Sequence, residues 1–356
     1  MTDRSRSLSV RLWLWGIALL IGAMVVVGGA TRLTQSGLSI TEWQPIAGAI
    51  PPLTERDWQA EFRNYQRIPQ YRELNRDMTL GEFKGIFWWE WAHRLLGRIV
   101  GVVVALPLIF FWWRGMIGAA LARRLGVIFV LGALQGALGW WMVSSGLAGS
   151  GRTSVAPYRL AMHLTLAVLL FAAVVWTARS LRPRRDEVPA APVVRIGAWA
   201  VLAMAFVQLF LGAVTAGLHA GLSFNTWPLM DGTLFPSAAQ LFPGQPAWLD
   251  LFTNPMTAQF FHRMGAYLLF ALALAHAATA WGRGPASRRA LAVLAMVTAQ
   301  ATLGILTLVN VVPIPLALCH QFGAIVVIAL ATADVEALGS ASPRVSRVES
   351  PVRAMG

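Results

Sequence analysis

Eight stretches of the chain are almost entirely apolar, and each is long enough to cross a membrane. A helix needs about 20 mostly apolar residues to span the hydrocarbon core. The stretches are residues 12–30, 88–113, 123–143, 157–178, 194–216, 256–281, 288–310 and 314–333. Apolar and polar residues do not alternate along them, as they would in the strands of a transmembrane barrel. The pattern therefore predicts an all-α polytopic membrane protein with eight transmembrane helices.

Composition supports this class. Of the 356 residues, 56% are hydrophobic and only 13% are charged, which is unusual for a soluble protein of this length. The single cysteine, Cys319, lies within the last apolar stretch. The chain therefore has no disulfide framework and no cysteine metal site.

The formal net charge of +13 comes mainly from arginines in alternate connections between the apolar stretches. These are Arg4, Arg6, Arg11, Arg114, Arg123, Arg124, Arg179, Arg182, Arg184, Arg185, Arg195, Arg283, Arg288, Arg289, Arg344, Arg347 and Arg353. By contrast, loop 31–87 has seven basic and seven acidic residues, and loop 217–255 has no Lys or Arg. The positive-inside rule then places both termini in the cytoplasm. The charge indicates orientation in the membrane and does not favour a nucleic-acid partner.

The first eleven residues are too short for a transit peptide, and the first helix has the features of one that is retained. We therefore expect a multi-pass protein of a bacterial inner membrane, in contact with lipid.

The two halves of the chain resemble each other. The segment SGLSITEWQPIAGAIPP (36–52) aligns without gaps with AGLSFNTWPLMDGTLFP (220–236), and EWAHRLLG (90–97) matches QFFHRMGA (259–266). QGALG (135–139), QLFLG (208–212) and QATLG (300–304) form a further set. Because each half has four helices, both halves take the same orientation. The sequence predicts two tandem four-helix bundles that arose by internal duplication.

The expected organisation has four parts. Residues 1–178 form the first bundle, with the long periplasmic loop 31–87, and residues 196–335 form the second bundle. Residues 179–195 are a cytoplasmic linker rich in arginine. Residues 336–356, rich in Ser, Pro and Arg, are expected to be a disordered cytoplasmic tail.

One histidine lies near the start of each even-numbered apolar stretch. Pro157, Pro255 and Pro315 suit the first turn of three of these helices, and a histidine follows each proline by five to seven residues. This places the imidazoles about 8–10 Å below the helix mouth, near the periplasmic side. The four histidines are His93, His163, His262 and His320.

Four imidazoles at a matched depth favour a binding site over four separate interhelical hydrogen bonds. Two facing imidazoles in a helical bundle are a common way of holding a haem iron. A zinc or copper ion would need a third ligand or a carboxylate at each pair, and only the first half has one. We expect haem, and no zinc or copper.

Several neighbouring polar residues receive other interpretations. Arg94 and Arg263 directly follow two of the histidines and are candidates for binding haem propionates, although snorkelling to the interface is an alternative. His276 is interpreted as a packing group and His219 as a solvated loop residue. Interhelical hydrogen bonding is the interpretation for Gln135, Gln208 and Gln300.

Glu90 lies three residues before His93, so both project from one helical face. The equivalent residue in the second half is Gln259, which cannot ionise. Oxidative chemistry must dispose of protons, whereas electron relay alone needs no carboxylate. The difference suggests a reactive first half, although an i,i+4 pair between Glu90 and Arg94 is the simpler alternative.

With these residues identified, residues 10–335 resemble the haem A synthases, which are assembly factors for haem-copper terminal oxidases. The resemblance rests on the eight-helix duplication, the first outer-loop motif GLSxTEWQPIxGxxPPL, Glu90-x-x-His93-Arg94, His163 in YRLAMHLTLA, His262-Arg263 and His320 in LCHQFGAI. The outer loops lack the cysteine pairs of some members, which is typical of the proteobacterial and mitochondrial class.

The resemblance implies an oxidoreductase that acts on a CH group and oxidises the C8 methyl of haem O to a formyl group by successive hydroxylations. It implies that His262 and His320 hold a permanent haem b, and that His93 and His163 hold the substrate haem beside Glu90. Haem O synthase and the oxidase assembly machinery are the expected partners, and a homo-oligomer is compatible with the sequence. The oxygen source and the electron acceptor stay open.

Two other classes of protein fit part of the pattern. A diheme b-type electron-transfer cytochrome would use all four histidines but would give the Glu90/Gln259 difference no purpose. A haem transporter would suit duplicated bundles, but no pair of helices broken by Gly or Pro lies at the midplane.

Overall fold

The computed structural model describes residues 3–182 and 190–339 and confirms an all-α protein with eight candidate membrane-spanning helices in these ranges. They are α1 (Asp3–Leu33), α4 (Leu80–Trp113), α5 (Ala119–Ser144), α6 (Pro157–Ser180), α7 (Pro192–Gly217), α10 (Pro255–Ala280), α11 (Pro285–Val309) and α12 (Ile314–Gly339). Pro157 and Pro255 begin their helices, as predicted, because proline suits a first turn that needs no donor.

Helix α4 begins eight residues earlier than its apolar stretch predicts. The Thr79 hydroxyl accepts a hydrogen bond from the Glu82 amide, and the Glu82 side chain accepts one from the Thr79 amide, which is a capping box. His93 therefore lies well inside α4, and not near its start as the other three histidines do. The apolar pattern marks only the membrane-embedded part of this helix, because its first turns are amphipathic.

The first turns of α4 are covered by the long connection that follows α1. This connection contains η1 (Ala47–Ala49), α2 (Glu55–Tyr65) and α3 (Pro69–Leu74). Tyr65, Phe83 and Phe87 are buried in an aromatic cluster between the connection and α4. Burial of these rings makes loop 31–87 a folded layer attached to the helix.

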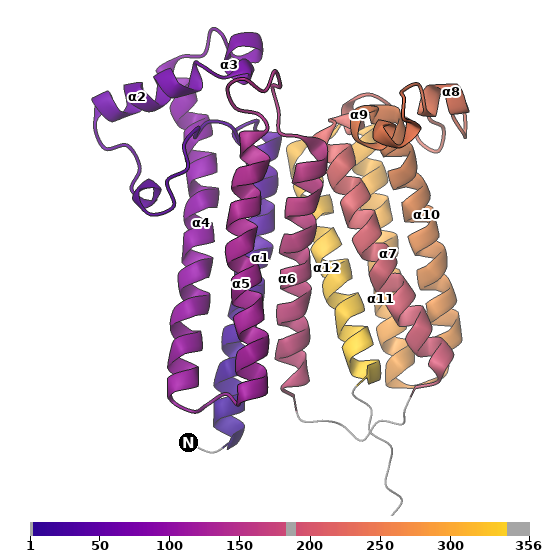
Figure 1. The fold of residues 1–356 in the computed structure, drawn as a ribbon. Helices are drawn as coiled ribbons and strands as arrows, with labels where there is room; N and C mark the ends of the chain where they lie inside the picture. The colour runs from indigo at the N-terminus through magenta and orange to yellow at the C-terminus, as the bar shows by residue number, and fades with distance from the viewer. Residues whose placement is uncertain (1–2, 183–189, 340–356) are drawn as a thin grey trace, which may run out of the picture.

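The other long connection lies at the same end of the molecule. It contains η2 (Ala220–Leu222), α8 (Ala238–Leu241), η3 (Ala247–Leu249) and α9 (Asp250–Thr253). Both connections lie opposite the N-terminal end of α1 (Figure 1). The structure thus has one end built from the two long connections, and we refer to it as the loop end.

Helices α1, α4, α5 and α6 contact one another in a ring, and so do α7, α10, α11 and α12. The two groups meet through contacts of α6 with α7 and of α12 with both α1 and α6. The largest apolar cluster runs through this junction and includes Leu14, Val168, Val201 and Ile328. In Figure 1 the groups stand side by side.

Two of the expected boundaries differ from the structure. Helix α7 already begins at Pro192, inside the predicted linker 179–195, and α12 continues to Gly339, past the predicted start of the tail. The predicted disorder of residues 340–356, and the centre of the linker at 183–189, lie outside the described residues.

Candidate functional site

Each of the four histidines packs its ring against a glycine on the candidate membrane-spanning helix that comes before its own in the chain. A Cβ atom built on Gly28 would lie 2.8 Å from Cε1 of His93, and one on Gly139 would lie 2.9 Å from Cε1 of His163. In the second half, Gly212 stands against His262 and Gly304 against His320, at 2.9 and 2.8 Å. Real Cβ atoms do not approach so closely, so only glycine lets each imidazole occupy this position.

The four glycines occupy equivalent places. Gly28, Gly139, Gly212 and Gly304 each lie five residues before the last residue of their helices, α1, α5, α7 and α11. At 1.5 Å per residue, this is about 7.5 Å below the loop end of each helix. The glycine contacts thus hold the four imidazoles at a similar depth. The positions of the histidines in the sequence do not by themselves reveal this match.

In the second half, the His262 and His320 rings face each other across the bundle. Their centroids are 6.5 Å apart, and their planes lie at 86°. Two imidazole nitrogens on opposite sides of one metal ion are about 4 Å apart, twice the length of an imidazole–metal bond. The ring centroids lie further back, so the observed separation fits two axial ligands of a single iron.

The imidazoles also have hydrogen-bonding capacity to spare. All four are partly exposed, and the Nδ1 atoms of His93 and His320 have no hydrogen-bond partner within the described part of the chain. Across residues 3–182 and 190–339, no three His, Cys, Asp or Glu side chains gather as a metal ion would require. Paired imidazoles without a third protein ligand suit a haem better than a bare ion.

Three glutamines connect the histidine-bearing helices to their neighbours. Gln135 on α5 donates to the carbonyl of His163 at 2.8 Å, Gln208 on α7 to that of His262 at 2.9 Å, and Gln300 on α11 to that of His320 at 2.7 Å. These contacts confirm the predicted interhelical role.

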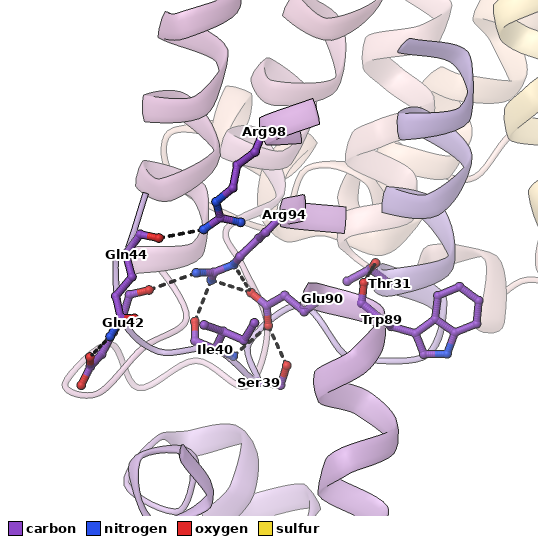
Figure 2. Close-up of polar contacts among 9 residues, drawn as sticks. All are labelled: Thr31, Ser39, Ile40, Glu42, Gln44, Trp89, Glu90, Arg94 and Arg98. Carbon is purple, nitrogen blue, oxygen red and sulfur yellow. Dashed lines mark hydrogen bonds and ion pairs between the residues drawn. The ribbon is translucent and has the colours of Figure 1, made fainter. Parts of the chain in front are cut away.

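Glu90 is a buried carboxylate, only 3% exposed, and both of its oxygens are fully occupied. Oε1 accepts hydrogen bonds from Nε and Nη2 of Arg94, at 3.1 and 2.6 Å. Oε2 accepts from the Ser39 hydroxyl at 2.8 Å and from the Ile40 amide at 2.9 Å (Figure 2). These four hydrogen bonds offset the cost of burying a carboxyl group.

Arg94 pairs with Glu90, as the simpler sequence interpretation proposed. Arg94 also donates to the carbonyls of Ile40 and Glu42, at 2.7 and 3.0 Å. One turn later, Arg98 donates to the carbonyl of Gln44 (Figure 2) and to that of Pro45. The two arginines therefore fasten the start of the first long connection to α4.

The second half repeats this arrangement at matching positions. Arg263 donates to the carbonyls of Phe224 and Thr226, at 3.1 and 2.8 Å. In the ungapped alignment of the two loops, these residues correspond to Ile40 and Glu42. Both guanidinium groups thus contribute donors to backbone carbonyls of the loops, whereas the sequence suggested haem propionates as their partners.

Gln259 differs from Glu90 in what it contacts as well as in charge. Its Oε1 accepts from Arg263 at 2.8 Å, as Glu90 accepts from Arg94. Its Nε2 donates to the carbonyl of Ala220 at 2.8 Å. Nε2 of Gln259 therefore faces a carbonyl acceptor, whereas the corresponding atom in the first half, Oε2 of Glu90, faces two donors. Each loop is shaped to its own residue.

The remaining histidines lie away from these pairs. His219 is exposed and follows α7 in a left-handed conformation. His276 is buried, with Nε2 2.7 Å from the carboxylate of Asp334, which also accepts from Arg289 at 3.0 Å. This supports the packing interpretation of His276, and no repeat or spacing in the sequence indicated Asp334 or Ser39 as partners.

One acidic group of the outer layer is electrostatically perturbed. Burial of Glu61 on α2 raises the pKa of its carboxyl, and the negative charges of Glu42 and Glu90 raise it further. Arg94 partly opposes this effect, and Oε2 of Glu61 has no hydrogen-bond partner among the described residues. The layer above the first histidine pair therefore contains a cluster of interacting charges.

Comparison with known proteins gives matches over nearly the whole chain. The family model described as cytochrome oxidase assembly protein matches residues 11–332. A heme A synthase from Bradyrhizobium sp. (strain ORS 278) is 55% identical over 339 residues, covering 94% of this chain and 92% of that protein. A heme A synthase from Rhizobium meliloti (strain 1021) is 52% identical over 351 residues, covering 98% and 94%.

Proposed function

The chain belongs to the cytochrome oxidase assembly protein family, and from that membership we propose that it is a haem A synthase, the enzyme that converts haem O to haem A. The observation that carries the proposal is the set of four histidine–glycine contacts at one depth, two in each half of the molecule. The relatives support an enzyme over the electron-transfer cytochrome and the haem transporter.

We assign the two halves different tasks. His262 and His320 would hold a permanent haem b, a proposal that the 6.5 Å separation of their ring centroids supports. A haem b there would supply a redox-active iron that accepts and passes on electrons. His93 and His163 would hold the substrate haem. The repeated loop contacts of Arg94 and Arg263 support an origin of the halves by duplication.

The proposed reaction oxidises the C8 methyl of haem O to a formyl group. Two successive hydroxylations give a gem-diol, which loses water to leave the aldehyde. With water as the oxygen source, the conversion of methyl to formyl consumes one water and releases four protons and four electrons, which an external electron acceptor must take up. Positive charge develops on the substrate whenever an electron leaves before its proton, so the site must tolerate it. Glu90 is a buried carboxyl group on the same helical face as His93, and we propose that it balances this positive charge.

The protein orients the histidine rings and shields the loop end of α4 from water. The glycine contacts determine where each imidazole lies, and the loop fastened by Arg94 and Arg98 covers the loop end of α4. These features limit the approach of water to a bound haem. The loop end is the expected periplasmic side of a bacterial inner membrane, with both termini in the cytoplasm. Haem O synthase and the terminal oxidase machinery are the proposed partners.

Extraction of the haems from the purified protein, followed by mass determination, tests the proposal. Co-expression with a source of haem O should give haem B together with haem O or haem A. Haem B alone would identify an electron-transfer cytochrome and contradict the synthase assignment.

A further inference from the structure

The three glutamines that donate to histidine carbonyls share one spacing from the glycine on their own helix, and helix α1 has a different residue at that spacing. Gln135, Gln208 and Gln300 each lie four residues before the glycine that contacts a histidine. In α1 the residue four before Gly28 is Met24. Because four residues are about one helical turn, all four side chains project from the same face as their glycines. His93 thus has methionine where the other three histidines have an amide.

The amide holds both the backbone and, in two cases, the ring. Besides the carbonyl bonds, Nε2 of Gln135 lies 3.1 Å from Nδ1 of His163, and Nε2 of Gln208 lies 2.9 Å from Nδ1 of His262. Gln300 lacks a comparable contact with the ring but holds the His320 carbonyl at 2.7 Å. A neighbouring helix therefore fixes each of these three histidines with at least one hydrogen bond.

His93 has neither bond. Its Nδ1 is without a hydrogen-bond partner in the described part of the chain, and Met24 cannot donate to its carbonyl. Met24 does face α4, since a Cβ built on Gly97, one turn after His93, would lie 3.4 Å from Met24 Cε. Apolar contact thus replaces the amide, and the glycine contact with Gly28 is what positions this ring.

The asymmetry falls within the first pair, where His163 is braced and His93 is not. Outer partners of a metal-binding histidine fix the ring and raise its basicity, and their loss typically costs 10–100-fold in affinity. A permanent group benefits from two ligands whose helices are both held. In the second half both histidine carbonyls accept from a glutamine, and the His262 ring is held as well, whereas the His320 Nδ1 is as unpartnered as that of His93 among the described residues. A molecule that must enter and leave benefits from one ligand that releases easily.

We propose that His93 is the axial ligand that detaches when the substrate haem enters and the product leaves, while His163 stays attached. This inference rests on the proposed function, because it assumes that the first pair binds an exchanging haem. Met24 is a positioning residue because it stands where the other three helices have a glutamine, and it therefore leaves His93 without that hydrogen bond. The rate of haem exchange at the first site is then limited by how firmly α1 holds His93.

The test is to replace Met24→Gln, with Met24→Leu as the apolar control and Gln135→Met as the reciprocal change. Each protein is purified after co-expression with a haem O source and mixed with excess apoglobin as a haem acceptor. Loss of haem O or haem A is followed over time by chromatography and mass. Haem B retained at the second site reports that the protein is folded. Optical spectra report whether the iron of the first site is six-coordinate and low-spin.

Met24→Gln should slow the loss of the first-site haem by about 10-fold and increase its low-spin fraction, because the new amide braces His93. Gln135→Met should accelerate the loss by a similar factor, and Met24→Leu should match the wild type. An unchanged rate in Met24→Gln, with full haem B, would overturn the proposal. If Met24→Gln fails to fold, an unchanged rate in Gln135→Met would overturn it equally. If haem B alone is found in every variant, it is the proposed function that fails.

Discussion

Gly139 on α5 lies directly against the imidazole of His163 on α6, so that a Cβ at Gly139 would come within 2.9 Å of Cε1. The same contact recurs at the other three histidines. The position of each histidine ring therefore depends on a residue without a side chain, because only the missing Cβ makes room for the ring.

Replacing Gly139→Ala should displace the His163 ring and lower retention of the substrate haem. An imidazole forced out of its rotamer costs about 0.5–1.5 kcal/mol, which corresponds to roughly 2- to 10-fold in affinity. Gly136→Ala is the matched control, since nothing lies within 4 Å of a Cβ built there. Haem content per protein after purification is the measurement. Equal retention by both variants would show that the glycine contact does not position the ring.

The two halves should bind haem unequally. Substituting His262 or His320 by alanine should remove the b-type haem, because in the proposed function each would supply one of the two protein ligands of its iron. Substituting His93 or His163 should leave the b-type optical spectrum intact and abolish haem A formation. The opposite result, with the b-type spectrum lost in His93→Ala and kept in His262→Ala, would mean that the halves are assigned backwards.

The apolar pattern predicted the eight helices well, because a membrane-spanning helix must satisfy its backbone internally and face lipid along its length. The same pattern placed the start of α4 too late. Leu80–Phe87 is amphipathic and is stabilised by burial of Phe83 and Phe87 under the outer connection, which a hydropathy criterion cannot detect. Local composition thus predicts membrane helices better than their extensions into water.

The site was partly predictable for a related reason. The histidines and Glu90 could be recognised as ionisable residues in apolar surroundings. Ser39, the Ile40 amide and the carbonyls bound by Arg94 could not, since they are distant in sequence and two of the three kinds of partner are backbone groups. Three of the four glycines were visible in the repeated QxxxG segments and Gly28 was not, and the contact of all four with the histidines follows only from helix packing.

The membrane orientation can be tested with reporter fusions. Fusions at Arg114, Arg283 and the C-terminus should report the cytoplasm, and fusions at Arg67 and Pro243 the periplasm, because the basic residues segregate in this way. Alkaline phosphatase and green fluorescent protein activities are the readouts. A periplasmic signal from Arg114 and Arg283 would invert the topology and place the histidine pairs near the cytoplasmic side.

Stability of the outer layer should depend on pH through Glu61. Its carboxyl has a raised pKa in the fold, mainly because of burial and then because of Glu42 and Glu90. A raised pKa means that the stabilising contribution is present at low pH and is lost as pH rises through the folded value. Glu61→Gln should therefore unfold at a higher temperature than the wild type at pH 8 and show little difference at pH 4. Tryptophan fluorescence during heating measures this. Identical curves at pH 8 would exclude a destabilising charge at Glu61.

Glu90 and Gln259 occupy matching positions but are not interchangeable. A glutamine at position 90 would have one oxygen for two sets of donors. If that oxygen accepts from Arg94, its amide nitrogen faces the Ser39 hydroxyl and the Ile40 amide. If it accepts from Ser39 and Ile40, the nitrogen faces Arg94. Loss of charge at this position therefore comes with partial loss of the loop contact, and an experiment must separate the two effects.

Glu90→Gln should keep the b-type haem and cripple conversion of haem O, with haem O or its singly hydroxylated product accumulating. The amide can neither accept a proton nor balance positive charge on the oxidised substrate, and a positioned acid–base group is typically worth 10²–10⁴-fold in rate. Glu90→Asp should fall between the wild type and Glu90→Gln, because it keeps the charge but moves it by one methylene.

Ser39→Ala is the matched control, since it removes one loop donor and leaves the carboxylate in place. Chromatography of haems extracted after co-expression with a haem O source measures all three. If Ser39→Ala loses as much haem A as Glu90→Gln, the carboxylate acts by anchoring the loop. Near-normal haem A from Glu90→Gln would reduce the residue to a structural partner of Arg94.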